Sequence, residues 1–380
     1  MPPPPLRAIL RPHILLLAAL PSVAACGSGP QAPPPLSKAA REAVTRDPGA
    51  PPEQVARAVD NLFTDPTLGE TRAVVLMHGG TVAAERYAPG YGPDTRFVSW
   101  SMAKTMTAAM IGMLVADGLL ELDAPAPVPR WNRPGDPRGE ITLRQLLQMR
   151  SGLRHTESGD PPYHSSEVRM LFLDGRDDMA EFATAQPLEA EPGRRFEYSS
   201  NTSVILADVA ARALTDSRNP EARRRAVADY LTTRIFAPLG MTSMVPEFDR
   251  AGTLIGGSLI HGTARDWARF GEFLRTKGSH RGAQLLPRGW VEAMVAPSPR
   301  SPHYGFQTWL NRPLPDGAEH PLFPTQAPQS MFAMIGHMGQ YALISPSQRV
   351  TLVRLGHSDA EQRAALMPRL AETLALYPAR

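Results

Sequence analysis

The sequence predicts an α+β fold in which one antiparallel sheet is assembled from both ends of the chain. Apolar runs typical of strands occur early, at residues 73–87, and again late, at 306–355. Between them, residues 126–249 carry apolar side chains mainly at helical spacing. We therefore expect an α/β part made of residues 53–125 and 250–380, flanked by terminal helices, with the mainly helical region 126–249 inserted into it.

Each element follows from apolar spacing and turn residues. Residues 73–78 and 81–87, separated by Gly79 and Gly80, have the pattern of a β-hairpin. Thr142 is a suitable cap for a short helix that follows it. Further helices are expected over residues 53–63, 179–185, 202–214, 221–236, 263–276, 287–295 and 361–376, and further strands over 306–310, 331–335, 341–344 and 350–355.

The first 25 residues indicate targeting. Two arginines precede the apolar segment 14–20, which is too short to span a bilayer, and small residues then lead to Cys26, the one cysteine of the chain. This pattern resembles a bacterial lipoprotein signal, which implies cleavage before Cys26 and diacylation of its thiol. Residues 26–52, rich in Pro and Gly, would then tether a folded domain, residues 53–380, to a membrane.

The expected location is the bacterial cell envelope, with the protein lipid-anchored and facing the periplasm or the exterior. The choice between inner and outer membrane stays open. The alternative is an ordinary secretory signal with an incidental cysteine, and it also places the mature chain outside the cytoplasm.

Composition excludes several function classes. The net charge is +3, and no basic run interleaved with aromatic residues suggests nucleic acid binding. The ten histidines show no His-Glu-x-x-His spacing, so we expect neither a metal nor a cofactor. The remaining membrane contact would be the lipid anchor alone.

The stretch 100–120 carries the first chemical signal. Its ionisable residues are Lys104 and Asp117 alone, so an apolar pattern on all sides predicts a buried helix. Positions three apart share a helix face, which lets the Lys104 ammonium reach the Ser101 hydroxyl. Free N–H groups at the helix start lie beside that hydroxyl. A nucleophile, a base and part of an oxyanion hole would thus share one helical turn.

Lysine is rare in this chain. Only three of the 40 Lys and Arg residues are Lys, so nearly every positively charged side chain is an Arg. Arg cannot lose its proton, whereas a buried Lys can, and this favours a proton-exchanging role for Lys104. The alternative is chance, because Ser-x-x-Lys is a weak pattern in a chain of this length.

Two further stretches could share that site. Residues 192–202 contain Tyr198, Ser200 and Asn201, which could equally be an ordinary helix cap with a packed tyrosine. Residues 336–340 contain His337 and Gly339, and here glycines would let a substrate lie against the backbone. A plain glycine turn with a surface histidine is the alternative.

In this order the three stretches resemble the serine β-lactamase and penicillin-binding-protein superfamily, whose motifs are Ser-x-x-Lys, Tyr-x-Asn or Ser-x-Asn, and Lys/His-x-Gly. The resemblance is closer to the class C and esterase-like branch, and within it to serine hydrolases similar to 6-aminohexanoate-dimer hydrolase. It implies a β-lactamase/transpeptidase-like fold. Supporting stretches are residues 149–153, 238–241, 256–259, 263–271 and 304–306.

The resemblance implies a role for each motif. Ser101 would be the acylated nucleophile, and Lys104 and Tyr198 would take and return its proton. Lys104 would either stay near neutrality or act as a fixed cation that lowers the Tyr198 pKa. The N–H groups of Ser101 and Gln340 would form the oxyanion hole.

The substrate-binding residues implied are Gln340, His337, Gly339, Ser200 and Asn201. Asn201 departs from the family pattern because it lies three residues after Tyr198 rather than two, so Ser200 can take that place. His337 stands where lactamases usually have Lys, and it is mostly neutral at neutral pH. We therefore expect weaker recognition of anionic lactams than of neutral esters.

The expected function is hydrolysis of a small-molecule ester or amide through an acyl-enzyme. A β-lactamase or D-Ala-type peptidase is the first alternative, because both use the same nucleophile. A non-catalytic envelope binding protein is the second.

Overall fold

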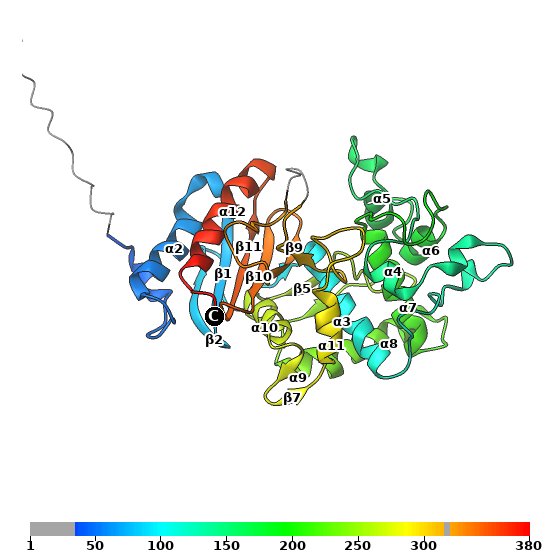
Figure 1. Ribbon diagram of the computed structural model, residues 1–380, viewed down its shortest axis with the longest axis horizontal. Coiled ribbons are helices and arrows are strands. Elements are labelled where there is room, and N and C mark those ends of the chain that lie inside the picture. The colour runs from blue at the N-terminus through cyan, green and yellow to red at the C-terminus, as the bar shows by residue number, and fades with distance from the viewer. Residues whose placement is uncertain (1–34, 315–319) are drawn as a thin grey trace, which may run out of the picture. The chain divides into compact units, whose positions relative to one another are not determined.

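The computed structural model describes residues 35–314 and 320–380 (Figure 1). The predicted signal peptide, Cys26 and the first part of the expected tether lie outside the described residues. Within the rest of that expected tether, helix α1 (Lys38–Glu42) buries Ala40, and the Thr45 N–H bonds the Ala83 carbonyl at 2.9 Å. The chain is therefore attached to the fold well before residue 53.

A six-stranded antiparallel sheet is assembled from both ends of the chain, as predicted. Its strand order is β2-β1-β11-β10-β9-β8, so the early hairpin pairs with the last strand. The strands are β1 (Glu70–His78), β2 (Thr81–Tyr87), β8 (Trp309–Leu310), β9 (Phe332–Gly336), β10 (Gln340–Ser345) and β11 (Val350–His357).

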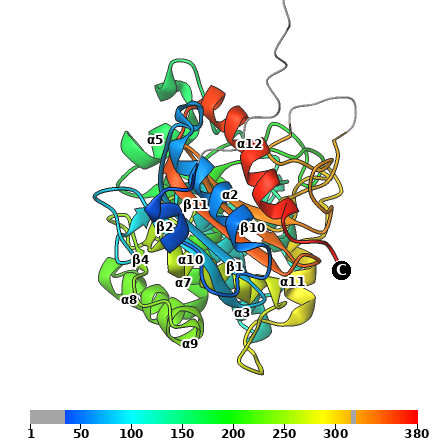
Figure 2. The same cartoon turned by 90° about the vertical axis from the view of Figure 1, so that its left-hand side faces the viewer.

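Strand periodicity divides the sheet into two apolar faces. Helices α2 (Pro52–Thr64) and α12 (Ala360–Ala375) cover one face, and α10 (Ala264–Arg275) packs on the other (Figures 1 and 2). Val74 and Val75 show the division, because successive side chains of a strand point to opposite faces and these two belong to separate clusters. The terminal helices therefore bury one face of the sheet, and α10 closes the other towards the helical region.

The inserted region is mainly helical, as expected. Its largest helix is almost wholly buried and packs against the helix that follows Ser101. The helices are α4 (Leu143–Leu147), α5 (Ser166–Phe172), α6 (Met179–Thr184), α7 (Ser200–Leu214), α8 (Pro220–Leu231), a π-helical turn η6 (Thr232–Phe236) and α9 (Ala237–Leu239), with α11 (Arg288–Met294) later in the chain.

The smaller elements connect these parts. One 3-10 helix, η5 (Pro162–His164), precedes α5, and two short sheets lie outside the main one. Their strands are β3 (Phe97–Val98), β4 (Val245–Pro246), β5 (Ile260–Gly262), β6 (Ser279–His280) and β7 (Ala283–Gln284).

One strand prediction was wrong over most of its length. Residues 306–308 form a turn, and only the last two residues of the predicted 306–310 strand pair with β9. Gln307 has a φ of +51° and its side chain accepts a hydrogen bond from Ser203 at 2.6 Å. The apolar run therefore reflects burial in a turn, because a strand cannot accommodate that backbone angle.

The predicted buried helix begins with a tighter turn. A 3-10 turn, η2 (Trp100–Met102), leads into α3 (Ala103–Ala116), in which every residue from Ala103 to Leu114 is buried.

In the described part of the chain no helix is long and apolar enough to cross a membrane.

Candidate active site

Ser101 lies on the 3-10 turn η2 and lines a cleft of about 1140 Å³. The preceding residue, Trp100, has a φ of +45°, which is uncommon for a residue with a bulky side chain. Such strain persists where the surrounding structure fixes it, and it is frequent next to reactive groups. The positive φ of Trp100 changes the direction of the backbone after β3, and Ser101, the next residue, lines the cleft.

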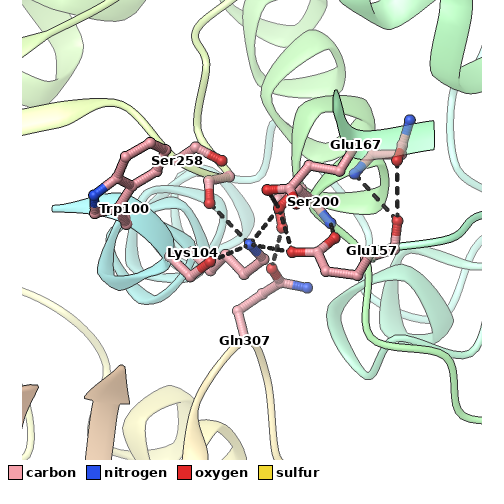
Figure 3. A network of polar contacts seen from close by, with 12 residues as sticks. Trp100, Lys104, Glu157, Glu167, Ser200, Ser258 and Gln307 are labelled. Atoms are coloured by element: carbon pink, nitrogen blue, oxygen red, sulfur yellow. Dashed lines mark hydrogen bonds and ion pairs between the residues drawn. The ribbon is translucent and has the colours of Figure 1, made fainter. Parts of the chain in front are cut away.

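Lys104 is held at the base of the cleft by three hydrogen bonds, and its side chain is only 1% exposed. Its Nζ donates to Ser101 Oγ at 2.9 Å, to Ser200 Oγ at 2.7 Å and to the Gly257 carbonyl at 2.8 Å (Figure 3). An ammonium group has three protons, so these contacts use all of them. The predicted proximity of Ser101 and Lys104 is therefore present, and two distant segments fix it.

The close approach of Gly257 to the lysine depends on its lack of a side chain. A Cβ atom at this position would lie 2.9 Å from the Ser200 carbonyl oxygen, closer than real Cβ contacts. Glycine lets the backbone run directly beside Ser200, so that one carbonyl reaches Lys104.

The surroundings of Lys104 keep it charged. Burial acts to lower its pKa, but Tyr198, Glu157 and Glu167 favour the cation, and the pKa of Lys104 is raised above its ordinary value. Glu157 lies 3.6 Å from the Nζ atom. Of the two alternatives from the sequence, the geometry favours the fixed cation over a lysine near neutrality in the resting enzyme.

Tyr198 lies beside this cation. The Lys104 Nζ is 4.8 Å from the centre of its ring, and Trp309 and Tyr304 pack against the same ring at 5.1 and 5.7 Å. Burial raises the pKa of Tyr198, and the nearby Lys104 offsets this only in part. Lys104 thus lowers the Tyr198 pKa as expected, but burial outweighs this effect, so the resting pair is a cationic lysine with a neutral phenol.

Ser200, rather than Asn201, occupies the position that contacts the lysine. Ser200 begins helix α7, for which Ser199 is the cap. Asn201 is buried, and its Oδ1 accepts a hydrogen bond from Ser166 Oγ at 3.0 Å, which ties α7 to α5. Asn201 is therefore a link between two helices and not a part of the cleft lining.

Sequence reasoning missed two carboxylates of the site. Glu157 and Glu167 both line the cleft and both contact the Ser200 hydroxyl, at 2.7 and 2.9 Å (Figure 3). Burial and the neighbouring Glu157 raise the pKa of Glu167 to about 7, against the opposing effect of Lys104. Neither residue belongs to a local motif, so no spacing signal could have found them.

The glycine turn after β9 contributes His337, which was predicted, and Gly336, which was not, to the cleft lining. His337 and Gly336 line the cleft, whereas Gly339 and Gln340 do not. Gln340 turns its side chain inward, donating to the Gly356 carbonyl at 2.7 Å and accepting from the Gly356 N–H at 3.0 Å. The Gln340 side chain therefore serves the turn and β11, whereas the role of the Gln340 N–H in the oxyanion hole stays a prediction.

Gly336 is the residue of this turn that approaches the nucleophile. A Cβ atom on Gly336 would lie 2.3 Å from the Ser99 carbonyl oxygen, so a side chain there would separate β9 from the segment that carries Ser101. His337 follows, and its ring packs edge-on against Trp100 at 5.4 Å. Partial burial, with Arg363 and His357 nearby, lowers the pKa of His337 below its ordinary value.

The rest of the cleft lining is mixed, with polar side chains such as Ser158, Gln326 and His303 among many apolar ones. Among its described lining residues Arg363 is the one permanent cation, while aromatic and aliphatic side chains form much of the wall. Within residues 35–314 and 320–380 no three His, Cys, Asp or Glu side chains are grouped to hold a metal ion.

Comparisons with known proteins give a family match for most of the chain. The family model described as Beta-lactamase matches residues 68–375. The 6-aminohexanoate-dimer hydrolase of Paenarthrobacter ureafaciens is 29% identical over 269 residues, which cover 66% of this chain and 65% of that protein. The chain therefore matches slightly less than two thirds of the length of this relative.

Solved structures share the fold. A Bacillus anthracis protein solved under the name of a 6-aminohexanoate-dimer hydrolase superposes with a TM-score of 0.68 at 22% identity, covering 91% of this chain and 88% of the other. A family VIII carboxylesterase gives a TM-score of 0.61 at 16% identity, with 85% and 96% covered. The fold is thus β-lactamase/transpeptidase-like, and the family match over residues 68–375 establishes that the chain belongs to the β-lactamase family.

Proposed function

We propose that this protein is a serine hydrolase that cleaves a neutral ester or amide through an acyl-enzyme on Ser101. The observation that carries the proposal is the 2.9 Å contact between Lys104 Nζ and Ser101 Oγ, at the base of an open cleft. A hydroxyl becomes nucleophilic when an adjacent group accepts its proton, and a lysine held at hydrogen-bond distance meets that geometric condition.

The reaction begins as Ser101 Oγ attacks the substrate carbonyl and its proton passes to Lys104, which must first release one of its own protons because the resting pair is a cationic lysine and a neutral phenol. Tyr198 lies beside Lys104 and can return a proton to the leaving alcohol or amine, because its hydroxyl interacts with both Ser101 and Lys104. Water then hydrolyses the acyl group by the reverse proton movements.

The oxyanion of the tetrahedral intermediate needs two N–H donors. We assign them to Ser101 and Gln340. Gly336 brings the turn against Ser99, and β10, which begins at Gln340, contacts the turn η2 that carries Ser101, which supports this assignment.

The lining of the cleft supports an uncharged substrate. One permanent cation lies there, along with two carboxylates and a largely apolar wall, and His337 has a lowered pKa. A substrate carboxylate would find few partners, whereas an apolar acyl chain would be desolvated favourably. The similarity to 6-aminohexanoate-dimer hydrolase supports an amide as readily as an ester.

Covalent labelling tests the proposed function. A fluorophosphonate probe should modify the wild-type protein on Ser101, and Ser101→Ala should abolish both labelling and ester hydrolysis with almost no change in melting temperature. Ser158→Ala is the matched control, because Ser158 is an exposed serine in the same cleft. Absence of labelling in the wild type would favour the non-catalytic binding protein.

A panel of substrates separates the hydrolase classes. p-Nitrophenyl esters, 6-aminohexanoate dimer, nitrocefin and D-amino-acid amides should be compared by kcat/KM. Faster turnover of nitrocefin or of D-amino-acid amides than of neutral esters would favour the β-lactamase or D-Ala-type peptidase.

We further propose that the enzyme works in the bacterial cell envelope, held by lipid on Cys26. The basic start, apolar segment and small residues before Cys26 support this location. Cys26→Ser should yield a species without the acyl mass and with unchanged activity. A mature wild-type protein that starts at another residue would contradict the anchor.

A further inference from the structure

Two carboxylates meet at one serine hydroxyl beside the proposed base. Glu157 lies in the loop after α4, and Glu167 lies in the first turn of α5. Their Oε1 atoms are 2.7 and 2.9 Å from Ser200 Oγ, and Glu157 Oε2 also accepts the Ser200 N–H at 2.6 Å. The Ser200 hydroxyl therefore connects both carboxylates to Lys104 by hydrogen bonds, while Glu157 Oε1 also lies 3.6 Å from Lys104 Nζ, beyond hydrogen-bond distance (Figure 3).

The three contacts of Ser200 Oγ fix the number of protons in the cluster. A serine hydroxyl has one proton to donate and two lone pairs. Lys104 donates to Ser200 Oγ at 2.7 Å, which uses one lone pair, and the Ser200 proton can satisfy one carboxylate. The other carboxylate makes a hydrogen bond only if it carries a proton and donates it. The arrangement therefore fits a glutamate pair that holds one proton.

Electrostatics agrees with this count. Burial and the charge of Glu157 raise the pKa of Glu167 to about 7, while Lys104 opposes the shift. The other described ionisable groups that act on the pair are Tyr198 before α7, Tyr304 before β8 and His337 in the β9–β10 turn. Glu167 therefore changes its protonation close to neutral pH, where the enzyme would work.

We propose that the Glu157 and Glu167 pair accepts a proton from Lys104 through the Ser200 hydroxyl, an inference that rests on the proposed hydrolase function. Lys104 is a cation with all three protons donated, so it cannot take the Ser101 proton until it loses one. Glu157 and Glu167 are the carboxylates beside this cation, and the hydrogen-bonded route from Lys104 to them passes through Ser200 Oγ.

The transfer balances without any other reactant. Once Glu167 has lost its own proton, the Ser200 O–H bond breaks as its proton moves to a carboxylate of the pair, and a new O–H bond forms with a proton from Lys104 Nζ. Lys104 is then neutral, with a lone pair facing Ser101 Oγ. It takes the Ser101 proton as the bond between Oγ and the substrate carbonyl carbon forms, and the reverse steps return every proton after deacylation. Glu157 and Glu167 act through Ser200 and are positioning residues.

The pH dependence of acylation tests this relay. The rate of the first turnover of a p-nitrophenyl ester should be measured between about pH 5 and 9 for the wild type, Glu167→Gln and Glu157→Gln. Gln keeps the size and a hydrogen bond but cannot accept a proton. Glu181→Gln on α6 is the matched control, since that glutamate pairs with Arg130 on the surface.

The wild-type rate should rise with pH through about 7 as Glu167 loses its proton. In Glu167→Gln that rise should disappear and the rate should fall by about tenfold or more, with a similar loss in Glu157→Gln. The Glu181→Gln control should match the wild type. If both site variants keep the wild-type pH profile and stay within about twofold of its rate, the relay is wrong.

A second variant covers failure to fold. Ser200→Ala removes the connecting hydroxyl and leaves both carboxylates, and it should lose the same rise near neutral pH while binding substrate with a similar KM. An unchanged pH profile in Ser200→Ala would also overturn the relay. The relay and the proposed function fail separately, because loss of fluorophosphonate labelling in the wild type contradicts the function, whereas a labelled wild type with unaffected variants contradicts the relay alone.

Discussion

Lys104 and Arg354 are two buried cations of this fold, and they differ in what surrounds them. Lys104 is 1% exposed and faces hydroxyls, carboxylates and a phenol. Arg354 on β11 is 0% exposed and donates to neutral oxygens of Thr71, Glu70, Gly339 and Ser358 at 2.8 to 3.0 Å. Both cations bond hydroxyls and backbone carbonyls, but Lys104 also has a phenol and two carboxylates beside it, Tyr198, Glu157 and Glu167, which can gain or lose protons.

The difference between these surroundings suits Arg354 to a structural role and Lys104 to a catalytic one. The planar Arg354 guanidinium joins β11 to β1 and to the turn that ends at Gly339, and burial lowers its pKa only to about 10. It thus stays charged in the physiological range. Lys104 is a point charge among titratable groups, which suits proton exchange. The predictions below test this contrast.

The largest effect is expected for Lys104→Arg. The substitution keeps the positive charge but removes a group that can lose a proton, so kcat/KM for a p-nitrophenyl ester should fall by about 10²–10⁴-fold. The melting temperature reports whether the longer side chain is accommodated. Activity within about tenfold of wild type in a folded variant would mean that Lys104 acts only as a cation.

Arg354→Lys should produce the opposite pattern. A single ammonium cannot reach all four oxygens that the guanidinium bonds, so at least one buried oxygen loses its partner. We expect a loss of about 2–3 kcal/mol in the free energy of unfolding, measured with urea, and kcat close to wild type. A stable variant with strongly reduced kcat would contradict a purely structural role for Arg354.

Glu167→Gln should change how stability depends on pH. The pKa of Glu167 is raised to about 7 in the folded protein, above the value of about 4.3 for an unfolded chain. Its contribution to stability is therefore fully present below pH 4.3 and is lost as pH rises through about 7. The free energy of unfolding of the wild type should fall relative to the variant by roughly 3–4 kcal/mol between these limits. Parallel curves for the two proteins would show that Glu167 holds no proton in the folded state.

The smallest effect is expected for His337→Lys. A fixed charge at the mouth of the cleft favours anionic lactams, so the lactam-to-ester ratio of kcat/KM should rise by about tenfold and lose its pH dependence. In the wild type the ratio should rise only at acidic pH, because burial lowers the His337 pKa. A lactam-to-ester ratio that is high in the wild type and constant with pH would favour the β-lactamase alternative.

The sequence predicted those parts of the site that local spacing determines. Ser101 and Lys104 are one helical turn apart, so their contact follows from the helix itself. The hairpin at Gly79 and the helix cap at Thr142 were predicted for the same reason. Such features depend on neighbours along the chain.

Features that depend on long-range packing could not be predicted. Glu157 and Glu167 come from a loop and a short helix, and only the folding of the helical region brings them to Ser200. The glycine turn shows a second limit. Its sequence does not reveal which residues face the cleft, because Gln340 begins β10 and turns inward to Gly356. The direction of the Gln340 side chain depends on its hydrogen bonds to Gly356 in β11, a strand later in the chain.

The most direct test of this account is the rate at which an acyl group appears on Ser101 in the wild type, Lys104→Arg and Arg354→Lys. Rapid quenching of p-nitrophenyl ester turnover, followed by mass spectrometry of the peptide that contains Ser101, gives that rate for each protein. We predict acylation of Ser101 at similar rates in the wild type and Arg354→Lys, and at least about 100-fold slower in Lys104→Arg. Acylation at another residue, or equal rates in the wild type and Lys104→Arg, would contradict the account.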